Sequence, residues 1–471
     1  MKTTKITYLS AISVVAVFFL VLWSVWYSCY YYTLYWQEGF AFFSTLPDFT
    51  DIQVDLHADV FRYLGAYLLQ FFRSPLFGAA IQAGFATFIV VCLGFCILKL
   101  LKEVRLMWIA FIPVPMFVAG QYADITLERS LLWCTCVLGA VVLCGLVNMK
   151  NVRLPIPKWL CSFVLMFGVP VIITGASVYR IMDKENEYQE ITCKVDYHAN
   201  RQEWQEVLKL IPPHVAQRDE FRLRYALLAL SETGQLADHA FGYGVKDYSQ
   251  FLFYGSEEPF ERNFNALFYQ ALDMPNETVH QCYQQCLTSP FGFNFKSLRM
   301  LVDTYLEMGN YAIADKYMEV LRHTSFHQEW VESRQAKLES LKDIQKDDVK
   351  EPAPFVSNFL ETITSLVNQY PTNKKYMDLC LCAILTTRNA EYFRQAFQVA
   401  GPVLYANGER IPRHYEEAIL LIALLDKDML KQYNISNESR TKFADFMNLY
   451  HSGQINLAKN KYPNSYWAFC F

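Results

Sequence analysis

Five apolar stretches occupy the first 181 residues of the chain, and a polar sequence with helical periodicity follows them. Most of these stretches approach the length of about 20 residues that a helix needs to cross the hydrocarbon core of a membrane. The third stretch is the shortest and contains Pro113 and Pro115, which disfavour a continuous helix. The sequence predicts five membrane spans, at about residues 8–30, 77–98, 106–119, 130–147 and 159–178.

The clearest helical unit of the polar part lies between Ser297 and His323. Its apolar residues recur at the spacing of two helices, separated by a turn at Gly309. The order of aromatic and small residues is similar to that of a tetratricopeptide repeat, in which small side chains let paired helices approach each other. The residues that we expect to form the core of this repeat are Tyr305, Gly309, Tyr311, Ala314 and Tyr317.

Weaker copies of this unit lie on both sides of it, the most distinct at residues 221–243. Because such repeats bury their cores only by stacking, the pattern predicts an α-solenoid of helix hairpins. A charged stretch with two prolines, 342–354, interrupts the pattern and is typical of an exposed linker. The predicted fold is all-α, with a transmembrane helical bundle at 1–181, tetratricopeptide-like repeats at 182–341, a linker at 342–354 and a second helical sub-array with an aromatic C-terminal tail at 355–471.

The orientation in the membrane follows from the basic residues beside the predicted spans. Cytoplasmic loops carry an excess of Lys and Arg, and every second flank of the spans is basic: Lys2 and Lys5, then Lys99, Lys102 and Arg105, then Lys150, Arg153 and Lys158. The N-terminus is therefore predicted to be cytoplasmic. Since the number of predicted spans is odd, residues from about Met182 onward are expected on the opposite side.

Composition and motifs exclude several classes of function. The formal net charge of −4 provides no general attraction to nucleic acid. Charged residues are almost absent from the apolar stretches, which argues against an ion or proton pathway through the membrane. The chain contains no Gly-rich phosphate loop, nucleophile elbow, HExxH motif or dinucleotide fingerprint. The sequence therefore assigns no catalytic residue, metal ligand or cofactor.

The loop between the first two predicted spans is the most plausible functional segment. It contains one histidine and several carboxylates: Glu38, Asp48, Asp51, Asp55, His57 and Asp59. Such residues near a membrane surface are candidates for binding a divalent cation, or for general-base catalysis on a lipid-linked substrate. The alternative interpretation is a solvated loop, because the acidic residues lack the spacing of a calcium-binding loop.

Three segments are similar to one known family: the C-terminal sequence KYPNSYWAFCF, the sequence QFFRSPLFGA at 70–79 and the sequence LALSETGQLADHAF at 228–241. Together they resemble a family of multi-pass membrane proteins from Bacteroidota whose function is uncharacterised. The resemblance covers most of the chain and implies the inner membrane of a Gram-negative bacterium. Members of that family often have more than five spans, and the resemblance supplies no catalytic residue.

Two hypotheses of function follow. In the first, the chain is a membrane-anchored helical-repeat protein, bound to membrane lipid, whose extracytoplasmic solenoid binds a partner protein in the cell envelope. In the second, the chain is an enzyme similar to membrane glycosyltransferases, which acts on a lipid-linked substrate through the acidic loop. The first is favoured, because the membrane domain is small for such an enzyme.

Overall fold

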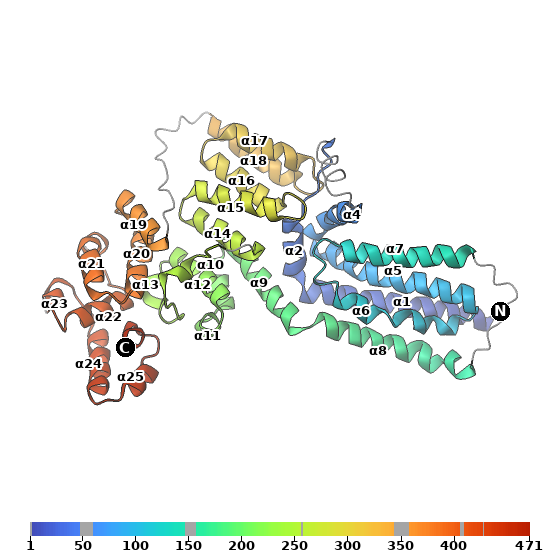
Figure 1. Ribbon diagram of the computed structural model, residues 1–471, viewed down its shortest axis with the longest axis horizontal. Helices are drawn as coiled ribbons and strands as arrows, with labels where there is room; N and C mark the ends of the chain where they lie inside the picture. Colours follow the sequence, from blue (N-terminus) through green and yellow to red (C-terminus); the bar gives the residue numbers. More distant parts are fainter. Residues whose placement is uncertain are drawn as a thin grey trace. The chain divides into compact units, whose positions relative to one another are not determined.

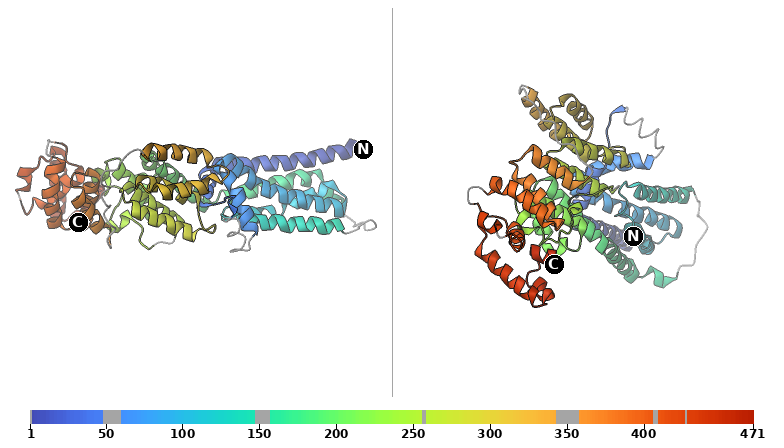
Figure 2. Two further views of the ribbon diagram at one scale, coloured as in Figure 1. Left: turned by 90° about the horizontal axis from the view of Figure 1, so that it is seen from above. Right: turned by 60° about the vertical axis from the view of Figure 1, so that its left-hand side comes forward.

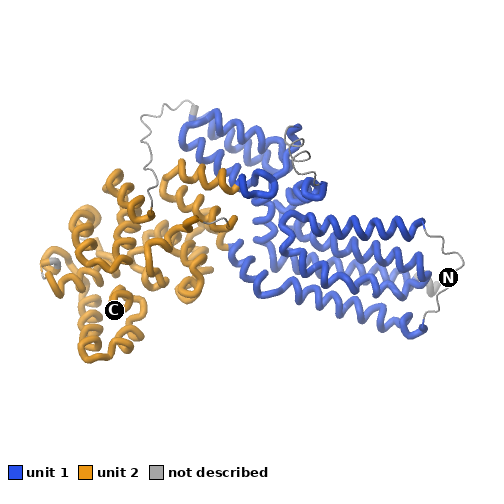
Figure 3. The backbone as a smooth tube through the Cα atoms, in the orientation of Figure 1, with its two compact units in different colours: residues 1–194, 286–345 blue, residues 195–285, 346–471 orange. Residues whose placement is uncertain are grey.

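The computed structural model describes residues 2–47, 60–146, 157–255, 258–342, 358–405, 409–426 and 428–471. All regular elements in these ranges are helices (Figure 1), which confirms the predicted all-α class. The chain forms two compact units, coloured separately in Figure 3: residues 1–194 with 286–345, and residues 195–285 with 346–471. The units therefore divide the chain differently from the domain boundaries expected above, since residues 182–341 contribute to both.

The first unit begins with long apolar helices that lie side by side (Figures 1 and 2). Helix α1 packs against α5 and α8, and α5 also packs against α7. By length and composition, four helices in the described residues are able to cross a membrane, and they coincide with the first, second, fourth and fifth predicted spans. Their bounds are α1 (Lys2–Cys29), α5 (Pro75–Leu101), α7 (Glu128–Leu146) and α8 (Phe163–Ile181).

The third predicted span, 106–119, does not form a helix of spanning length. It is divided into a 3₁₀ helix, η2 (Val104–Phe111), and a short helix, α6 (Val114–Ala119). The division has a physical cause in the two prolines, which cannot donate backbone hydrogen bonds. Pro113 takes the N-cap position of α6 and Pro115 lies in its first turn, where a missing N–H is tolerated. A fifth long spanning helix is therefore not confirmed.

The broken segment nevertheless lies along α1. Its neighbours progress in one direction along α1 and the residue that follows it: Val104 shares an apolar cluster with Ala11, Phe111 packs against Phe18, and Tyr122 packs against Tyr30. The two aromatic pairs have ring centroids 5.3 Å apart. From Ala11 to Tyr30 an α-helix rises by about 28 Å, close to the thickness of the hydrocarbon core. Residues 104–122 thus run parallel to α1 over most of its length.

Besides the long helices, the first unit contains shorter ones. In two of these helices, α9 and α15, the boundary between the two units falls within the helix. The bounds are α2 (Tyr31–Phe40), α4 (Val60–Leu69), η1 (Gln70–Arg73), η3 (Lys158–Cys161), α9 (Lys184–Asn200), α15 (Pro275–Thr288), α16 (Phe295–Glu307), α17 (Tyr311–Arg322) and α18 (Gln328–Lys342).

The predicted repeat unit forms a helix hairpin from α16 and α17. Gly309 lies in the turn with a φ of 78°, a left-handed conformation that favours glycine. Ala314 is fully buried, and the rings of Tyr305 and Tyr317 stack with centroids 6.1 Å apart. Tyr311 begins the second helix of the hairpin. The hairpin agrees with the predicted positions, and its membership in a tetratricopeptide array remains a prediction.

The second unit consists of shorter helices around an apolar core that is rich in aromatic side chains. The largest of its fully buried side chains include those of Tyr225, Phe251, Phe264, Tyr415 and Trp467. Its elements are α10 (Trp204–Leu210), α11 (Pro213–Ala216), α12 (Glu220–Glu232), α13 (Leu236–His239), η4 (Tyr248–Phe251), α14 (Pro259–Ala271), α19 (Phe359–Gln369), α20 (Lys374–Thr386), α21 (Ala390–Leu404), α22 (Arg413–Ile422), α23 (Met429–Gln432), α24 (Asn437–His451), α25 (Ile455–Lys461) and α26 (Tyr466–Cys470).

One glycine of the first unit should not tolerate a side chain. A Cβ atom on Gly65, in α4, would lie 2.0 Å from the backbone oxygen of Thr126. We expect Gly65→Ala to destabilise the protein by about 1–3 kcal/mol, because α4 has to move away from this backbone. Gly139→Ala is the matched control, since no atom lies within 4 Å of a Cβ at that position in α7. Thermal unfolding of both variants in detergent tests the difference, and equal melting temperatures would contradict it.

Candidate functional site

Of the acidic loop, the structure describes only Glu38; Asp48, Asp51, Asp55, His57 and Asp59 lie outside the described residues. Glu38 lies in α2 and is completely buried. A solvated carboxylate would be exposed, so the interpretation as a solvated face does not apply to Glu38. An ionised carboxylate is rarely buried without a partner. The contacts of Glu38 therefore indicate the role of this residue.

Helix α2 is fixed at both ends. At its first turn, the carboxylate of Glu190 accepts hydrogen bonds from the backbone N–H groups of Tyr32 and Thr33, at 2.9 and 2.8 Å. This carboxylate replaces the missing side-chain cap, since the N-cap residue is Tyr30. After its last turn, the backbone oxygen of Ala41 accepts a hydrogen bond of 3.0 Å from the N–H of Phe295. Glu38 is therefore held in place by contacts with α9 and α16.

The partner of Glu38 is His327, which lies immediately before α18. Nε2 of His327 is 3.0 Å from Oε1 of Glu38, and each side chain is only 1% exposed. Nη1 of Arg73 lies 3.9 Å from Oε2 on the other side of the carboxylate. The ring of Phe295 covers the imidazole, with centroids 4.3 Å apart. We refer to Glu38, Arg73 and His327 as the polar joint.

Two hydrogen bonds donated by backbone N–H groups flank the polar joint. The N–H of Thr45 donates to the backbone oxygen of His323 at 2.9 Å, and the N–H of Ser325 donates to Oε1 of Gln70 at 3.1 Å. The contacts of the joint thus link the chain on both sides of the loop after α1 to the turn between α17 and α18. Described residues on both sides of this loop therefore take part in attaching the polar helices to the membrane domain.

The charges in the joint follow from burial and from the neighbouring cations. Burial opposes ionisation of Glu38, but the His327 contact and the positive charges of Arg299 and Arg73 outweigh it and lower the pKa of the carboxyl group. Burial lowers the pKa of His327. Nδ1 of His327 has no hydrogen-bond partner among the described residues. Burial thus opposes charge on both partners, while their mutual contact favours ionisation of the carboxyl group.

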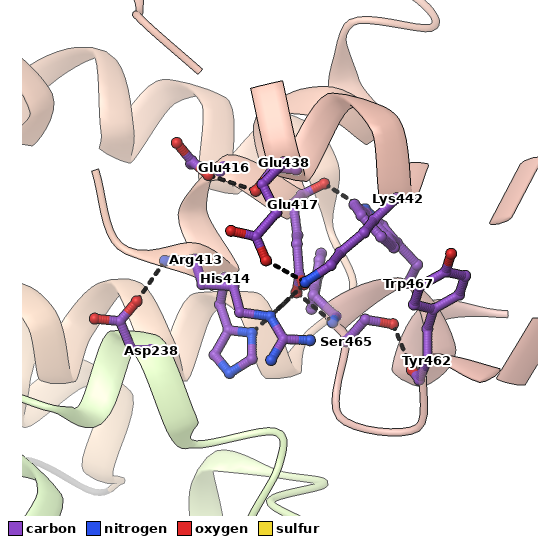
Figure 4. A network of polar contacts seen from close by, with 12 residues as sticks. Asp238, Arg413, His414, Glu416, Glu417, Glu438, Lys442, Tyr462, Ser465 and Trp467 are labelled. Carbon is purple, nitrogen blue, oxygen red and sulfur yellow. Dashed lines mark hydrogen bonds and ion pairs between the residues drawn. The ribbon is translucent and has the colours of Figure 1, made fainter. Parts of the chain in front are cut away.

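A second buried network holds the C-terminal tail in the second unit (Figure 4). The carboxylate of Glu417 lies 2.8 Å from Nε of Arg413 and 3.0 Å from Nδ1 of His414. It accepts a 2.7 Å hydrogen bond from the N–H of Tyr466, while its backbone oxygen accepts one of 2.9 Å from Nε1 of Trp467. Burial opposes ionisation of Glu417, but the His414, Arg413 and Tyr466 contacts lower its pKa. The tail is thereby docked on α22.

Both networks are structural in character. A catalytic carboxylate has to reach a substrate, yet the side chains of Glu38 and Glu417 are 1% and 3% exposed. No group of three or more potential metal ligands occurs among the described residues. The glycosyltransferase hypothesis therefore loses Glu38 as an accessible acid, and its other loop residues are outside the described ranges.

The comparisons with known proteins place the chain in one family. The model of a family described as of unknown function (DUF6057) matches residues 5–186 and 156–471. No curated protein and no solved structure matches the chain.

Proposed function

The chain belongs to this family of unknown function, and we propose that it is a membrane-anchored helical protein that holds a partner protein at the surface of the cell envelope membrane. The observation that carries the proposal is the polar joint. A buried contact between a carboxylate and an imidazole, and flanking hydrogen bonds of backbone N–H groups, attach α16, α17 and α18 to the membrane domain. The helices are therefore firmly attached to the membrane domain instead of being tethered by a flexible linker.

A firm attachment favours binding. When the binding surface is already ordered, association loses less conformational entropy, and more of the contact energy appears as affinity. The tetratricopeptide-like array predicted from the sequence also favours a binding function, since arrays of this kind bind proteins or peptides on one face.

For the orientation, we propose a cytoplasmic N-terminus and extracytoplasmic helices after α8, in the inner membrane of a bacterium. The proposal requires an odd number of crossings, and the contacts of residues 104–122 along α1 support a fifth one. Helical hydrogen bonds in η2 and α6, and those from the N–H of Ile112 to the backbone oxygen of Ile109 and from the N–H of Phe117 to that of Pro113, satisfy part of the backbone polar groups at membrane depth. On the two sides of the break Phe111 and Val114 are buried, while Ile112 within it is 54% exposed.

Reporter fusions test this orientation. We expect alkaline phosphatase to be active when fused after Glu190 and inactive when fused after Lys102. If residues 104–122 do not cross, the fusion after Glu190 should be inactive and a cytoplasmic fluorescent reporter at that position should be bright. A fusion after Phe40 serves as the positive control for the outer side, since it follows α1 directly.

The partner is tested by photo-crosslinking in intact cells. We expect probes at Lys316 and Glu332, which are exposed on α17 and α18, to crosslink the same protein. A probe at Leu143, an exposed apolar residue of α7, is the control and should capture lipid. Capture of lipid alone, or of unrelated proteins at each position, would contradict the proposal.

A further inference from the structure

A polar groove of 570 Å³ lies on the second unit, over one face of α19. The opposite face of this helix is buried, because Phe359, Ile363 and Leu366 point into the core. The groove face carries hydrophilic residues at helical spacing, and two tyrosines come from η4 and α21. The polar side chains that line the groove include those of Tyr248, Glu361, Thr364, Ser365, Asn368 and Tyr392.

The composition of the groove restricts the chemistry of its ligand. None of the described residues that line it is Lys, Arg or His, so a phosphate or carboxylate would find no counter-charge. The lining contains one aliphatic residue, Leu360, so an acyl chain would bury little apolar surface. The one charged residue is Glu361. A ligand that fits is polar and uncharged.

Several side chains of the groove are available for binding. Those of Ser365, Asn368 and Tyr392 make no hydrogen bond to another described residue. The hydroxyl of Thr364 donates to the backbone oxygen of Leu360 at 2.7 Å and keeps its capacity to accept. The ring of Tyr392 is 37% exposed. The groove thus offers an amide, hydroxyl groups and an exposed aromatic ring.

We propose that this groove binds a neutral carbohydrate chain. A sugar ring combines hydroxyl groups, which both donate and accept, with apolar C–H faces. Asn368 can donate and accept at the same time, as the hydroxyl groups of a sugar require. The tyrosines provide apolar ring faces for the C–H surface together with hydroxyl groups at their edges. Pockets of this volume are typical of sites for small ligands.

This site goes beyond the protein partner proposed above and does not depend on it. The groove lies in the second unit, whereas the polar joint and the crosslinking positions lie in the first. Loss of the partner would leave oligosaccharide binding unchanged, and failure of the groove to bind oligosaccharides would leave the crosslinking result unchanged.

The test is the binding of short neutral oligosaccharides to the purified full-length chain in detergent, on a panel of immobilised β-glucan, α-glucan, mannan and N-acetylhexosamine chains. Asn368→Ala or Tyr392→Ala should lower the affinity about tenfold, the effect of one lost hydrogen bond or ring contact. Asn448→Ala and Tyr450→Ala, both exposed on α24, are the matched controls and should bind like the parent protein. Equal melting temperatures exclude an effect on folding.

Two results would overturn the proposal. One is that no neutral oligosaccharide on the panel binds. The other is that binding occurs but the groove variants and the α24 controls have the same affinity, which would place the carbohydrate elsewhere. We also expect acidic oligosaccharides to bind less tightly than neutral ones, because Glu361 would repel them. Glu361→Gln should reduce this difference in affinity.

Discussion

Replacing Glu38 by alanine is expected to release α16–α18 from the membrane domain, at a cost in stability of about 2–4 kcal/mol from the cavity and the unpaired imidazole. The carboxylate and its imidazole partner are both 1% exposed, so bulk water does not reach their contact while the structure is closed. The substitution also leaves Arg73 without its nearby carboxylate. Hydrogen exchange should show the change as a loss of amide protection in α2 and α18.

The control for this variant is Glu339→Ala, which removes an exposed carboxylate from α18 and should change protection by less than about 0.5 kcal/mol. His327→Ala should resemble Glu38→Ala. The double variant should cost less than the sum of the two, because the residues contact each other. Additive effects, or unchanged protection in Glu38→Ala, would show that the joint does not hold the helices.

The same joint predicts how stability depends on pH. The folded state lowers the pKa of His327 below the ordinary value of 6.5, so the unfolded chain binds a proton more readily. Stability should therefore fall as the pH decreases below about 6.5. The lowered pKa of Glu38 adds a further loss below its ordinary value of 4.5. Hydrogen exchange of α18 as a function of pH measures this, and His327→Gln should remove the first step.

The second large effect is expected for the C-terminal tail. Trp467 is 1% exposed, and its ring packs against Phe443 and Phe446 while its N–H bonds the backbone of Glu417. Trp467→Ala should destabilise the second unit by about 3–5 kcal/mol, through the cavity and the unpaired buried oxygen. The measurement is hydrogen exchange in α22 and α24 of the full-length chain.

Phe471→Ala is the control from the same tail. Phe471 is 40% exposed, so its removal should cost less than about 1.5 kcal/mol, although it also contacts Phe446 and Tyr450. If Trp467→Ala and Phe471→Ala reduce protection equally, the docking of the tail does not depend on the buried indole.

The sequence predicts the helical class and four of the long helices because apolar periodicity is a local property. It also places the turn at Gly309, whose left-handed conformation favours glycine. The third span could not be predicted in detail, because the helix-breaking effect of Pro113 and Pro115 competes with an apolar composition that favours crossing. The outcome depends on packing against α1.

The polar joint could not be predicted, because its two main residues are far apart in the sequence. Glu38 stands out as an acid near a membrane span, but no feature near His327 identifies it as the partner. Only the fold brings α2 and α18 together. The network of Glu417 is similar: the aromatic tail indicates that it has to be buried, but its partner on α22 follows from tertiary contacts.

The division of the second unit into residues 195–285 and 346–471 has a consequence for biosynthesis. A ribosome completes the first of these segments well before the second, and the chain between them belongs to the other unit. Contacts such as the hydrogen bond from the Tyr376 hydroxyl to the backbone of Leu272 close long loops, which slows folding. The early segment is therefore exposed during translation and is expected to require chaperone protection until the last residues, including the docked tail, emerge.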